Sequence, residues 1–388
     1  MSRLRLPFVD TALTGATQLT TALLAPVSGA TKGVHRSMGA GRRAVRRHGI
    51  ASPRYADGIF HNTLPLQVTD ATDNAPLLLD WLRRDDRGRP PGPVPVEPPT
   101  LPETAAPLAA TWLGHATVLL EVDGRWVLTD PVWSDRVSPS ANVGPRRSHP
   151  VPMPLEELPR LSAVLISHDH YDHLDTATID ALVRLQDVVF VVPLGIGAHL
   201  RRWGVPKHRF HELDWDDQVE VDGLTFTCTE ARHFSGRGLS RNNTLWASWV
   251  VTGPHHRVLF GGDTGYTPAF GGIGASYGPF DLTLLPIGAY DPRWPDVHLD
   301  PEEAVRVHRE AGGAVLLPIH WLTFDLAFHA WAEPVERLLT EASVHGVPVA
   351  TPPPGRRFEV EPAASDGLPR DDWWTAVRRA AGSVRDRT

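Results

Sequence analysis

The sequence predicts an α+β protein in which β-sheets are covered by helices on their outer faces. Three observations support this prediction. Apolar runs of about four to eight residues, typical of strands, recur from residue 109 onward. Stretches with a helical spacing of apolar residues, such as 176–185 and 301–310, separate some of these runs. The strands also occur in groups rather than in strict alternation with helices, which favours sheets with helices packed outside them.

The residues before position 109 differ in composition from the rest of the chain. Residues 1–55 combine many small residues with a basic run between positions 32 and 47. We interpret them as an N-terminal extension, either a solvated arm or a segment that lies on anionic lipid. Residues 56–108 are rich in proline and glycine, as is typical of a linker, and a short amphipathic helix is predicted over 76–85.

The main folded domain is predicted to cover residues 109–360. Its first strands are two β-rich runs, 111–122 and 125–132, around the turn signal Asp123-Gly124. Residues 163–167 form a short apolar run typical of a buried strand, and a helix is predicted over 176–185. Further strands are predicted over 188–193, 224–230, 247–251, 258–260, 282–285 and 314–318.

Two more helices are predicted toward the C-terminus. The first covers 301–310, where Pro301 suits the first turn and the acidic Glu302 and Glu303 suit the positive end of the helix dipole. The second covers 371–384, within a C-terminal segment of residues 361–388.

The composition excludes several classes of protein. A net charge of −7 gives no reason to expect nucleic-acid binding, and the single cysteine, Cys228, excludes a disulfide framework and a cysteine-based zinc site. No apolar stretch reaches the roughly 18 residues of a membrane-spanning helix. Because Asp10 interrupts the threonine-rich stretch after Arg3 and Arg5, we expect a cytoplasmic protein without a cleaved signal peptide. Peripheral contact with a membrane is the alternative.

The densest cluster of the 19 histidines follows the predicted strand 163–167 directly. It contains His168, His170, Asp172 and His173. Where the chain leaves a sheet, side chains are released from strict alternation, so neighbouring residues can point to one place. Imidazole and carboxylate groups are ligands for zinc and similar first-row metals. The cluster therefore predicts a metal site.

Three further metal-competent residues also follow predicted strands, namely His233, Asp263 and His320. Four strand ends that carry such groups are better explained by one site than by chance. Seven ligands are too many for one tetrahedral ion, but they suit two ions that share Asp263. Two-metal hydrolases hold their ions about 3.5–4 Å apart and activate a hydroxide between them.

The pattern His-x-His-x-Asp-His followed by a distant His, Asp and His resembles the metallo-β-lactamase fold over residues 109–355. The resemblance implies a four-layer αββα sandwich with an N-terminal extension and a dinuclear site at one edge of its two sheets. It implies two Zn²⁺ per chain, although other first-row divalent metals fit the same ligands. By the family pattern, His168, His170 and His233 hold the first metal, Asp172, His173 and His320 hold the second, and Asp263 bridges them.

Longer strings, among them VLISHDHYDHLD, GGDTGY and PIHWLTF, are similar to the N-acylphosphatidylethanolamine-hydrolysing phospholipase D branch and its bacterial relatives. This resemblance implies a zinc-dependent phosphodiesterase that uses a metal-bridging hydroxide. Its substrate would be N-acylphosphatidylethanolamine, cleaved to N-acylethanolamine and phosphatidic acid. Tyr171 and His298 match positions that contact the substrate. The sequence departs from the family pattern at Pro295-Asp296 and over the first 100 residues. These departures concern the lipid-binding groove and the membrane contact that the family resemblance implies.

Four residues are expected to act beside the metals. His298 is expected to bind or protonate the leaving group, and Asp172 is expected to belong to the catalytic set as well as to bind metal. His115 and Asp130 are expected to orient ligands by hydrogen bonds, since a ligating histidine commonly donates its other nitrogen to a supporting group.

Three alternatives remain open from the sequence. A lactonase-like sugar-phosphate hydrolase, or another phosphodiesterase with a soluble substrate, would use the same fold and metals. A two-iron oxidoreductase on this fold would carry a glutamate in place of His170 and a flavin module, for which the chain offers no candidate segment. A binding protein that has lost its metals is opposed by the full set of seven ligands.

Overall fold

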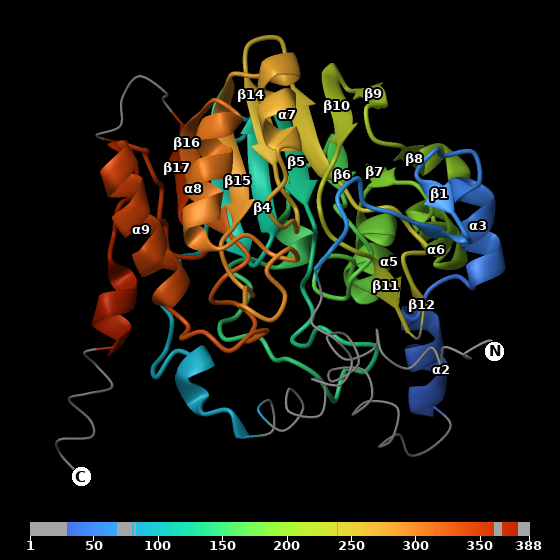
Figure 1. The fold of residues 1–388 in the computed structure, drawn as a ribbon, viewed down its shortest axis with the longest axis horizontal. Coiled ribbons are helices and arrows are strands. Elements are labelled where there is room, and N and C mark those ends of the chain that lie inside the picture. Colours follow the sequence, from blue (N-terminus) through green and yellow to red (C-terminus); the bar gives the residue numbers. More distant parts are fainter. Residues whose placement is uncertain (1–28, 68–79, 81–82, 239, 361–366, 379–388) are drawn as a thin grey trace, which may run out of the picture.

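The strands form two large mixed sheets that pack face to face, as the computed structural model shows for residues 29–67, 80, 83–238, 240–360 and 367–378 (Figure 1). The first sheet has seven strands in the order β17-β3-β4-β5-β6-β7-β8, and the second has six in the order β16-β15-β14-β13-β10-β9. Helices lie outside both sheets, which gives the four-layer αββα arrangement of the metallo-β-lactamase fold.

The bounds of the strands are as follows. The first sheet contains β3 (Leu108–Gly114), β4 (Thr117–Val122), β5 (Arg125–Thr129), β6 (Ala163–Leu165), β7 (Val189–Pro193), β8 (Phe210–Leu213) and β17 (Arg357–Glu359). The second contains β9 (Gln218–Val221), β10 (Leu224–Thr229), β13 (Ser248–Thr252), β14 (Arg257–Phe260), β15 (Phe280–Pro286) and β16 (Gly313–Ile319). Two short hairpins are formed by β1 (Tyr55–Ala56) with β2 (Ile59–Phe60) and by β11 (Gly236–Arg237) with β12 (Ser240–Arg241).

The helices connect and cover these sheets. They are α2 (Gly29–Ser37), α3 (Arg42–Gly49), α5 (Thr176–Leu185), α6 (Ile196–Arg202), α7 (Ala269–Tyr277), α8 (Pro301–Glu310) and α9 (Glu333–His345). Short 3₁₀ turns lie at Asp86–Gly88, Leu155–Glu157 and Lys207–Arg209. No described helix is both long and apolar enough to cross a membrane.

Strand direction brings many carboxyl ends to one edge of the sandwich. Strands β5 to β8 run parallel in the first sheet, and β14 to β16 run parallel in the second. Strands β3 and β10 are each two antiparallel steps from one of these parallel strands, so they point the same way. Loops that leave these strands therefore meet at this edge, where open α/β sheets usually bind their ligands.

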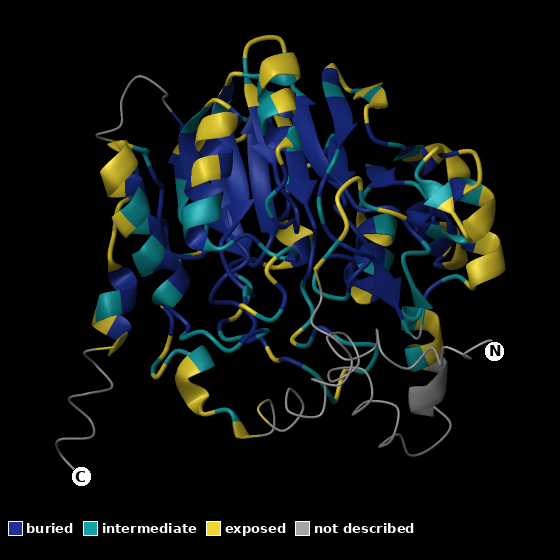
Figure 2. Ribbon diagram, viewed as in Figure 1, coloured by how far each residue is buried: buried dark blue, intermediate teal, exposed yellow. Residues whose placement is uncertain are grey.

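The strands are buried on both faces, which explains their continuous apolar runs. In β4, Val118 and Leu120 belong to the central core between the sheets, whereas Leu119 points outward into the core under α5 and α6. Figure 2 shows the strands as largely buried and the outward sides of the helices as exposed. This rigid frame holds the loops at the sheet edge.

Most of the predicted elements are present. The helices predicted over 176–185 and 301–310 are α5 and α8 with the same bounds, and both begin at an aspartate that caps the first turn. The strands predicted from residue 163 onward are confirmed, with ends that differ by no more than two residues. The last predicted helix is described only over 373–378, because residues 379–388 lie outside the described residues. Most of the helix predicted over 76–85 also lies outside them.

The single strand run predicted over 111–122 was wrong, because the chain turns sharply within it. Strand β3 ends at Gly114 and β4 begins at Thr117, with φ of 114° at Gly114 and 55° at His115. The turn has no Asn-Gly or Asp-Gly signal and is followed by apolar residues, so its sequence looks like uninterrupted strand. This turn presents His115 at the sheet edge.

The described part of the N-terminal extension packs on the domain and is not a solvated arm. Arg36 Nη2 lies 2.6 Å from Asp180 Oδ1 on α5, and Trp203 Nε1 donates to the Arg36 carbonyl at 2.9 Å. Val45 of α3 is buried, and Phe60 of β2 belongs to the central core. Residues 29–60 are therefore part of the folded body.

Candidate metal centre

The structure brings all seven predicted ligands together at the carboxyl edge of the two sheets. The loop after β6 supplies four of them, and the loops after β10, β14 and β16 supply one each. Their side chains form overlapping groups whose ligand atoms lie within 4.8 Å of one another. These side chains are His168, His170, Asp172, His173, His233, Asp263 and His320.

One group consists of His168, His170, His233 and Asp263, all buried. His170 Nδ1 lies 2.7 Å from His168 Nε2 and 3.4 Å from His233 Nε2. The Nε2 atoms of His168 and His233 each lie 3.8 Å from Asp263 Oδ2. Three nitrogens and one oxygen thus converge on one point, as the ligands of a four-coordinate metal do.

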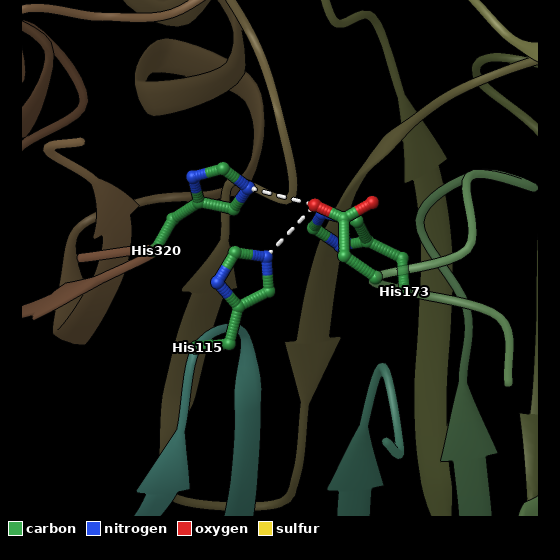
Figure 3. A group of neighbouring side chains, drawn as sticks. His115, His173 and His320 are labelled. Atoms are coloured by element: carbon green, nitrogen blue, oxygen red, sulfur yellow. Dashed lines mark hydrogen bonds and ion pairs between the residues drawn. The ribbon is translucent and has the colours of Figure 1, made fainter. Parts of the chain in front are cut away.

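The other group consists of Asp172, His173 and His320, together with His115. His115 Nε2 lies 3.0 Å from Asp172 Oδ2, and His320 Nε2 lies 3.5 Å from the same oxygen (Figure 3). His173 Nε2 and His320 Nε2 each lie 3.1 Å from Asp263 Oδ2. Asp263 therefore lies between the two groups and contacts both.

The buried polar atoms of the centre fit bound cations. Buried atoms are normally hydrogen-bonded, and the exceptions need an explanation. Here the Nε2 atoms of His173 and His320, Oδ1 of Asp263 and Nδ1 of His298 are buried without a hydrogen-bond partner. Nitrogen and oxygen atoms that face one another in this way, without hydrogen-bond geometry, are the donor set that a first-row divalent metal requires.

Two carboxylates divide the histidines into two electrostatic classes. Burial lowers the pKa of His170 to about 3 and that of His298 to about 4, so both rings are neutral. Burial also opposes the charged form of His320, but Asp263 and Asp172 outweigh it and raise its pKa to about 9. Imidazole binds metal in its neutral form. A metal ion bound at His320 would therefore replace the proton that Asp263 and Asp172 stabilise on this ring.

Asp130 orients two of the predicted ligand histidines, His173 directly and His168 through Ser167, at their Nδ1 atoms. Its Oδ2 accepts a hydrogen bond from Ser167 Oγ at 2.5 Å and lies 2.7 Å from His173 Nδ1. Ser167 Oγ in turn lies 2.9 Å from His168 Nδ1. The nitrogens that do not face the centre are therefore held by one buried carboxylate and one hydroxyl.

The backbone of the described residues is strained mainly at this edge. Positive φ is uncommon for residues other than Gly, and Asn, Asp and His adopt it more often than the rest. Among the described residues other than Gly, Asn and Asp, it occurs at His115, Ala289, His320 and Leu322, and all four lie in or beside the centre. Each conformation costs about 1–3 kcal/mol and persists only where the surroundings enforce it. His320 N donates to the His115 carbonyl at 3.0 Å, which locks two of these residues together.

A cleft opens onto the centre and contains both predicted substrate residues. His298 Nδ1 lies 3.9 Å from Asp263 Oδ2, and 13% of its side chain is exposed. Tyr171 also lines the cleft, while its hydroxyl accepts a hydrogen bond from Gly238 N at 3.2 Å and its ring packs under Arg237. Much of the remaining wall is apolar, namely Val137, Pro139, Pro145, Phe234, Trp294, Val297 and Leu326.

Sequence reasoning missed two residues that support the centre. Thr323 Oγ1 accepts a hydrogen bond from His115 N at 2.7 Å and so fixes the β3–β4 turn. Asn62, in the segment predicted as a linker, hydrogen-bonds the backbone of His233. Thr323 lies within the string PIHWLTF, but its hydrogen bond to the distant His115 turn is not visible in that string. Asn62 lies outside the quoted motifs and acts through a contact with a distant part of the chain, so no local signal identifies its role.

Comparison with known proteins agrees with this geometry. Residues 125–321 match the beta-lactamase superfamily domain. A protein of Mycobacterium tuberculosis with no assigned function, Rv0906, is 53% identical over 348 residues, which cover 88% of this chain and 92% of that protein. N-acyl-phosphatidylethanolamine-hydrolyzing phospholipase D 1 of Caenorhabditis elegans is 42% identical over 244 residues, 60% of this chain and 68% of that protein.

A solved structure supports the fold. Igni18, a metallo hydrolase from the archaeon Ignicoccus hospitalis, aligns with a TM-score of 0.52 at 23% identity, covering 66% of this chain and 99% of that one. The fold and the histidine–aspartate cluster define a hydrolase of the metallo-β-lactamase fold. The chain belongs to the β-lactamase superfamily, and within it resembles the N-acylphosphatidylethanolamine-hydrolysing phospholipase D proteins.

Proposed function

We propose that the protein is a zinc-dependent phosphodiesterase of the phospholipase D type. It hydrolyses N-acylphosphatidylethanolamine to N-acylethanolamine and phosphatidic acid. The observation that carries this proposal is the convergence of five histidines and two aspartates at one sheet edge, with buried nitrogen and oxygen atoms that lack hydrogen-bond partners. The similarity to the Caenorhabditis elegans phospholipase D supports the proposed substrate class.

Each proposed zinc ion would have its own ligands and would share one. His168, His170 and His233 would hold the first, Asp172, His173 and His320 would hold the second, and Asp263, which contacts both groups, would be shared. Two such ions, when bound, neutralise phosphate oxygens and lower the pKa of water to near neutrality. This chemistry suits a phosphodiester, which is a poor electrophile with a negative charge.

The chain's own groups complete the proposed reaction. His298 is neutral at pH 7, since burial lowers its pKa to about 4, and it faces the cleft beside Asp263. A neutral imidazole at this place can bind the leaving alcohol or relay a proton to it. His115 holds the Asp172 oxygen Oδ2, which also lies near His320, where the second ion would bind. Tyr171 forms the side wall against which the substrate lies.

The apolar part of the cleft lining supports a lipid substrate. Its wall includes Phe234, Trp294 and Leu326, which suit an acyl chain, while most of the polar side chains of the cleft belong to the metal centre. Helix α3 adds support for peripheral membrane contact, because Arg42, Arg43, Arg46 and Arg47 are all exposed and Ile50 beside them is 61% exposed. Basic residues next to an exposed apolar side chain are suited to anionic lipid surfaces.

A substrate panel tests the proposal. The purified full-length protein is analysed for metal and then assayed with an N-acyl phospholipid, a glycerophosphodiester, a sugar lactone phosphate and a thioester. We expect about two equivalents of zinc and a clear preference for the N-acyl phospholipid. Preference for the lactone phosphate would support the sugar-phosphate hydrolase instead. Two equivalents of iron would favour an oxidoreductase, and absence of metal would refute the proposal.

A further inference from the structure

Residues 60–67, here called the strap, connect the N-terminal part of the chain to two loops of the metal centre. Phe60 anchors the strap in the central core, and its backbone N–H donates to the Asn242 carbonyl at 2.7 Å. The strap then runs past the loop that carries His233 and reaches the loop that carries His298 through Gln67. The sequence had indicated only a linker here.

Asn62 satisfies both backbone polar groups of His233 with one side chain. Its Nδ2 donates to the His233 carbonyl at 2.7 Å, and its Oδ1 accepts from His233 N at 3.1 Å. Trp246 Nε1 donates to the same Oδ1 at 3.0 Å. The Trp246 N–H is shared with the Ala231 carbonyl, also at 3.0 Å, so the His233 N–H and carbonyl are the groups that fix the orientation of the amide, with oxygen toward the N–H.

This contact matters because His233 lies beyond the end of β10 and one residue beyond the isolated bridge between Arg232 and Gly265, which is the last backbone pairing before it. Buried backbone groups need partners, and Asn62 supplies them in place of a neighbouring strand. The ring of His233 is fixed separately, since its Nδ1 lies 2.8 Å from the Val297 carbonyl. With backbone and Nδ1 both held, Nε2 is directed at Asp263 and His170.

A second tie joins the strap to the loop before His298. Asp296 Oδ2 accepts a hydrogen bond from Gln67 N at 2.6 Å, and Asp296 Oδ1 lies 2.6 Å from Arg232 Nη1. Arg232 Nη2 donates to the Pro65 carbonyl at 2.6 Å. Asp296 belongs to the dipeptide in which the sequence departs from the phospholipase D pattern. Its partners join this dipeptide to the strap, directly at Gln67 and through Arg232 at Pro65.

We propose that Asn62 is a positioning residue for the metal ion held by His168, His170 and His233. The inference rests on the proposed function, because it assumes that metal binds there. Asn62 touches neither metal nor substrate and acts by holding the His233 backbone. Loss of a partner that orients a ligand typically costs about 10–100-fold in metal affinity. The effect should fall on one of the two ions, since His173 and His320 lie on other loops.

The test compares Asn62→Ala and Asn62→Asp with a matched control in the full-length protein. Thr63→Ala is the control, because it removes an exposed hydrogen bond from the same strap, Thr63 Oγ1 to Glu230 Oε2 at 2.9 Å, that does not touch the centre. Zinc affinity is measured by competition with a chromogenic chelator, and the site geometry by the absorption spectrum of the Co²⁺-loaded protein.

We expect N62A to lower the affinity for one of the two zinc ions by about 10–100-fold and to alter the Co²⁺ spectrum of that site. T63A should leave both the affinity and the spectrum unchanged. N62D keeps both accepted hydrogen bonds but turns a carboxylate oxygen toward the His233 carbonyl, so a loss of affinity is expected there too. If N62A does not fold, the zinc affinity and the Co²⁺ spectrum of N62D test the positioning role of Asn62.

The failure of this inference can be told apart from failure of the proposed function. Wild-type affinities and an unchanged Co²⁺ spectrum in a folded Asn62 variant would overturn the positioning role and leave the proposed function intact. An equal loss in T63A would also overturn it, because the effect would then belong to the strap in general. A wild-type protein that binds neither Zn²⁺ nor Co²⁺ would overturn both.

Discussion

Asp263 is the residue on which the centre depends. Its Oδ2 lies between 3.1 and 3.9 Å from nitrogens of His168, His173, His233, His298 and His320. Burial alone would raise the pKa of Asp263, but the surrounding histidines hold it well below its usual range. One buried carboxylate thus faces five imidazoles from both ligand groups at once.

Asp263→Ala is expected to remove metal and activity together. The bridging oxygen contacts both ligand groups, so its loss weakens both ions, and activity should fall by roughly a thousandfold or more. Metal content by elemental analysis and hydrolysis of the preferred substrate measure the two effects. Retention of two metal equivalents would contradict the bridging role.

His298→Ala is expected to lower turnover while leaving metal bound. The side chain faces the cleft and is partly exposed, and proton transfer by a positioned group is worth about 10²–10⁴-fold. kcat is measured beside zinc content, with Asp263→Ala as the metal-free reference. If zinc is lost as well, His298 serves as scaffold rather than as a substrate contact.

At the scale of elements, helix α8 shows how the sequence fixes a boundary and a packing contact together. Asp300 and Glu303 form a reciprocal capping box around Pro301. Inside the helix, His308 is buried against the second sheet, where its Nδ1 lies 2.8 Å from Thr283 Oγ1. A Cβ at Gly313 would come within 2.4 Å of that nitrogen, so Gly313 leaves room for the ring.

His308 should make stability depend on pH. Burial lowers its pKa from 6.5 to about 4, so the unfolded chain binds a proton that the folded chain does not. The free energy of unfolding therefore decreases as pH falls from about 6.5 toward 4, and His308 accounts for about 2 kcal/mol of this decrease between pH 7 and pH 5. His308→Gln keeps a hydrogen-bonding group and removes the titration.

Urea unfolding of wild type and His308→Gln at pH 7 and pH 5 measures this effect. The variant should be less stable than wild type at pH 7 and should lose about 2 kcal/mol less on acidification. Because other buried histidines titrate equally in both proteins, the comparison isolates His308. Parallel losses in the two proteins would contradict the assignment.

At the scale of the whole molecule, the centre ties the two sheets together at one edge. Residues His115, His168 and His173 come from the first sheet's loops, and His233, Asp263 and His320 from the second's. Without ions, their unpartnered buried atoms oppose this closure, because buried polar groups without partners cost free energy. Metal binding should therefore stabilise the entire fold.

Removal of metal is expected to lower the melting temperature. A ligand that binds only the folded state at about a thousand times its Kd adds about 4 kcal/mol, which corresponds to a shift of several degrees for a protein of this size. Differential scanning calorimetry with chelator, and then with zinc restored, measures the shift. Asp263→Ala should show none, and an unchanged wild-type transition would contradict metal binding at the interface of the sheets.

The sequence predicted the features that depend on neighbouring residues. His168 to His173 follow a recognisable strand, and α8 carries its own capping residues, so both were found without knowledge of the rest of the chain. The helices α6, α7 and α9 were not predicted. Glycines interrupt the apolar residues of α6 and α7, so packing on the rest of the fold decides their structure. Helix α9 carries local signals, namely a proline in its first turn and Gly346 at its end, so it was within reach of sequence analysis.

By itself the sequence determined the fold class, the ends of the strands that precede the seven predicted ligands and the types of ligand, because each is a local pattern with a physical cause. Only the tertiary structure decided the turn that presents His115, the contact of Asp172 with that ring, and the use of Asn62 to hold His233. These contacts join residues 57 and 171 positions apart. Hydrogen bonds over such separations form only when both sheets have folded and the carboxyl ends of their strands lie at one edge.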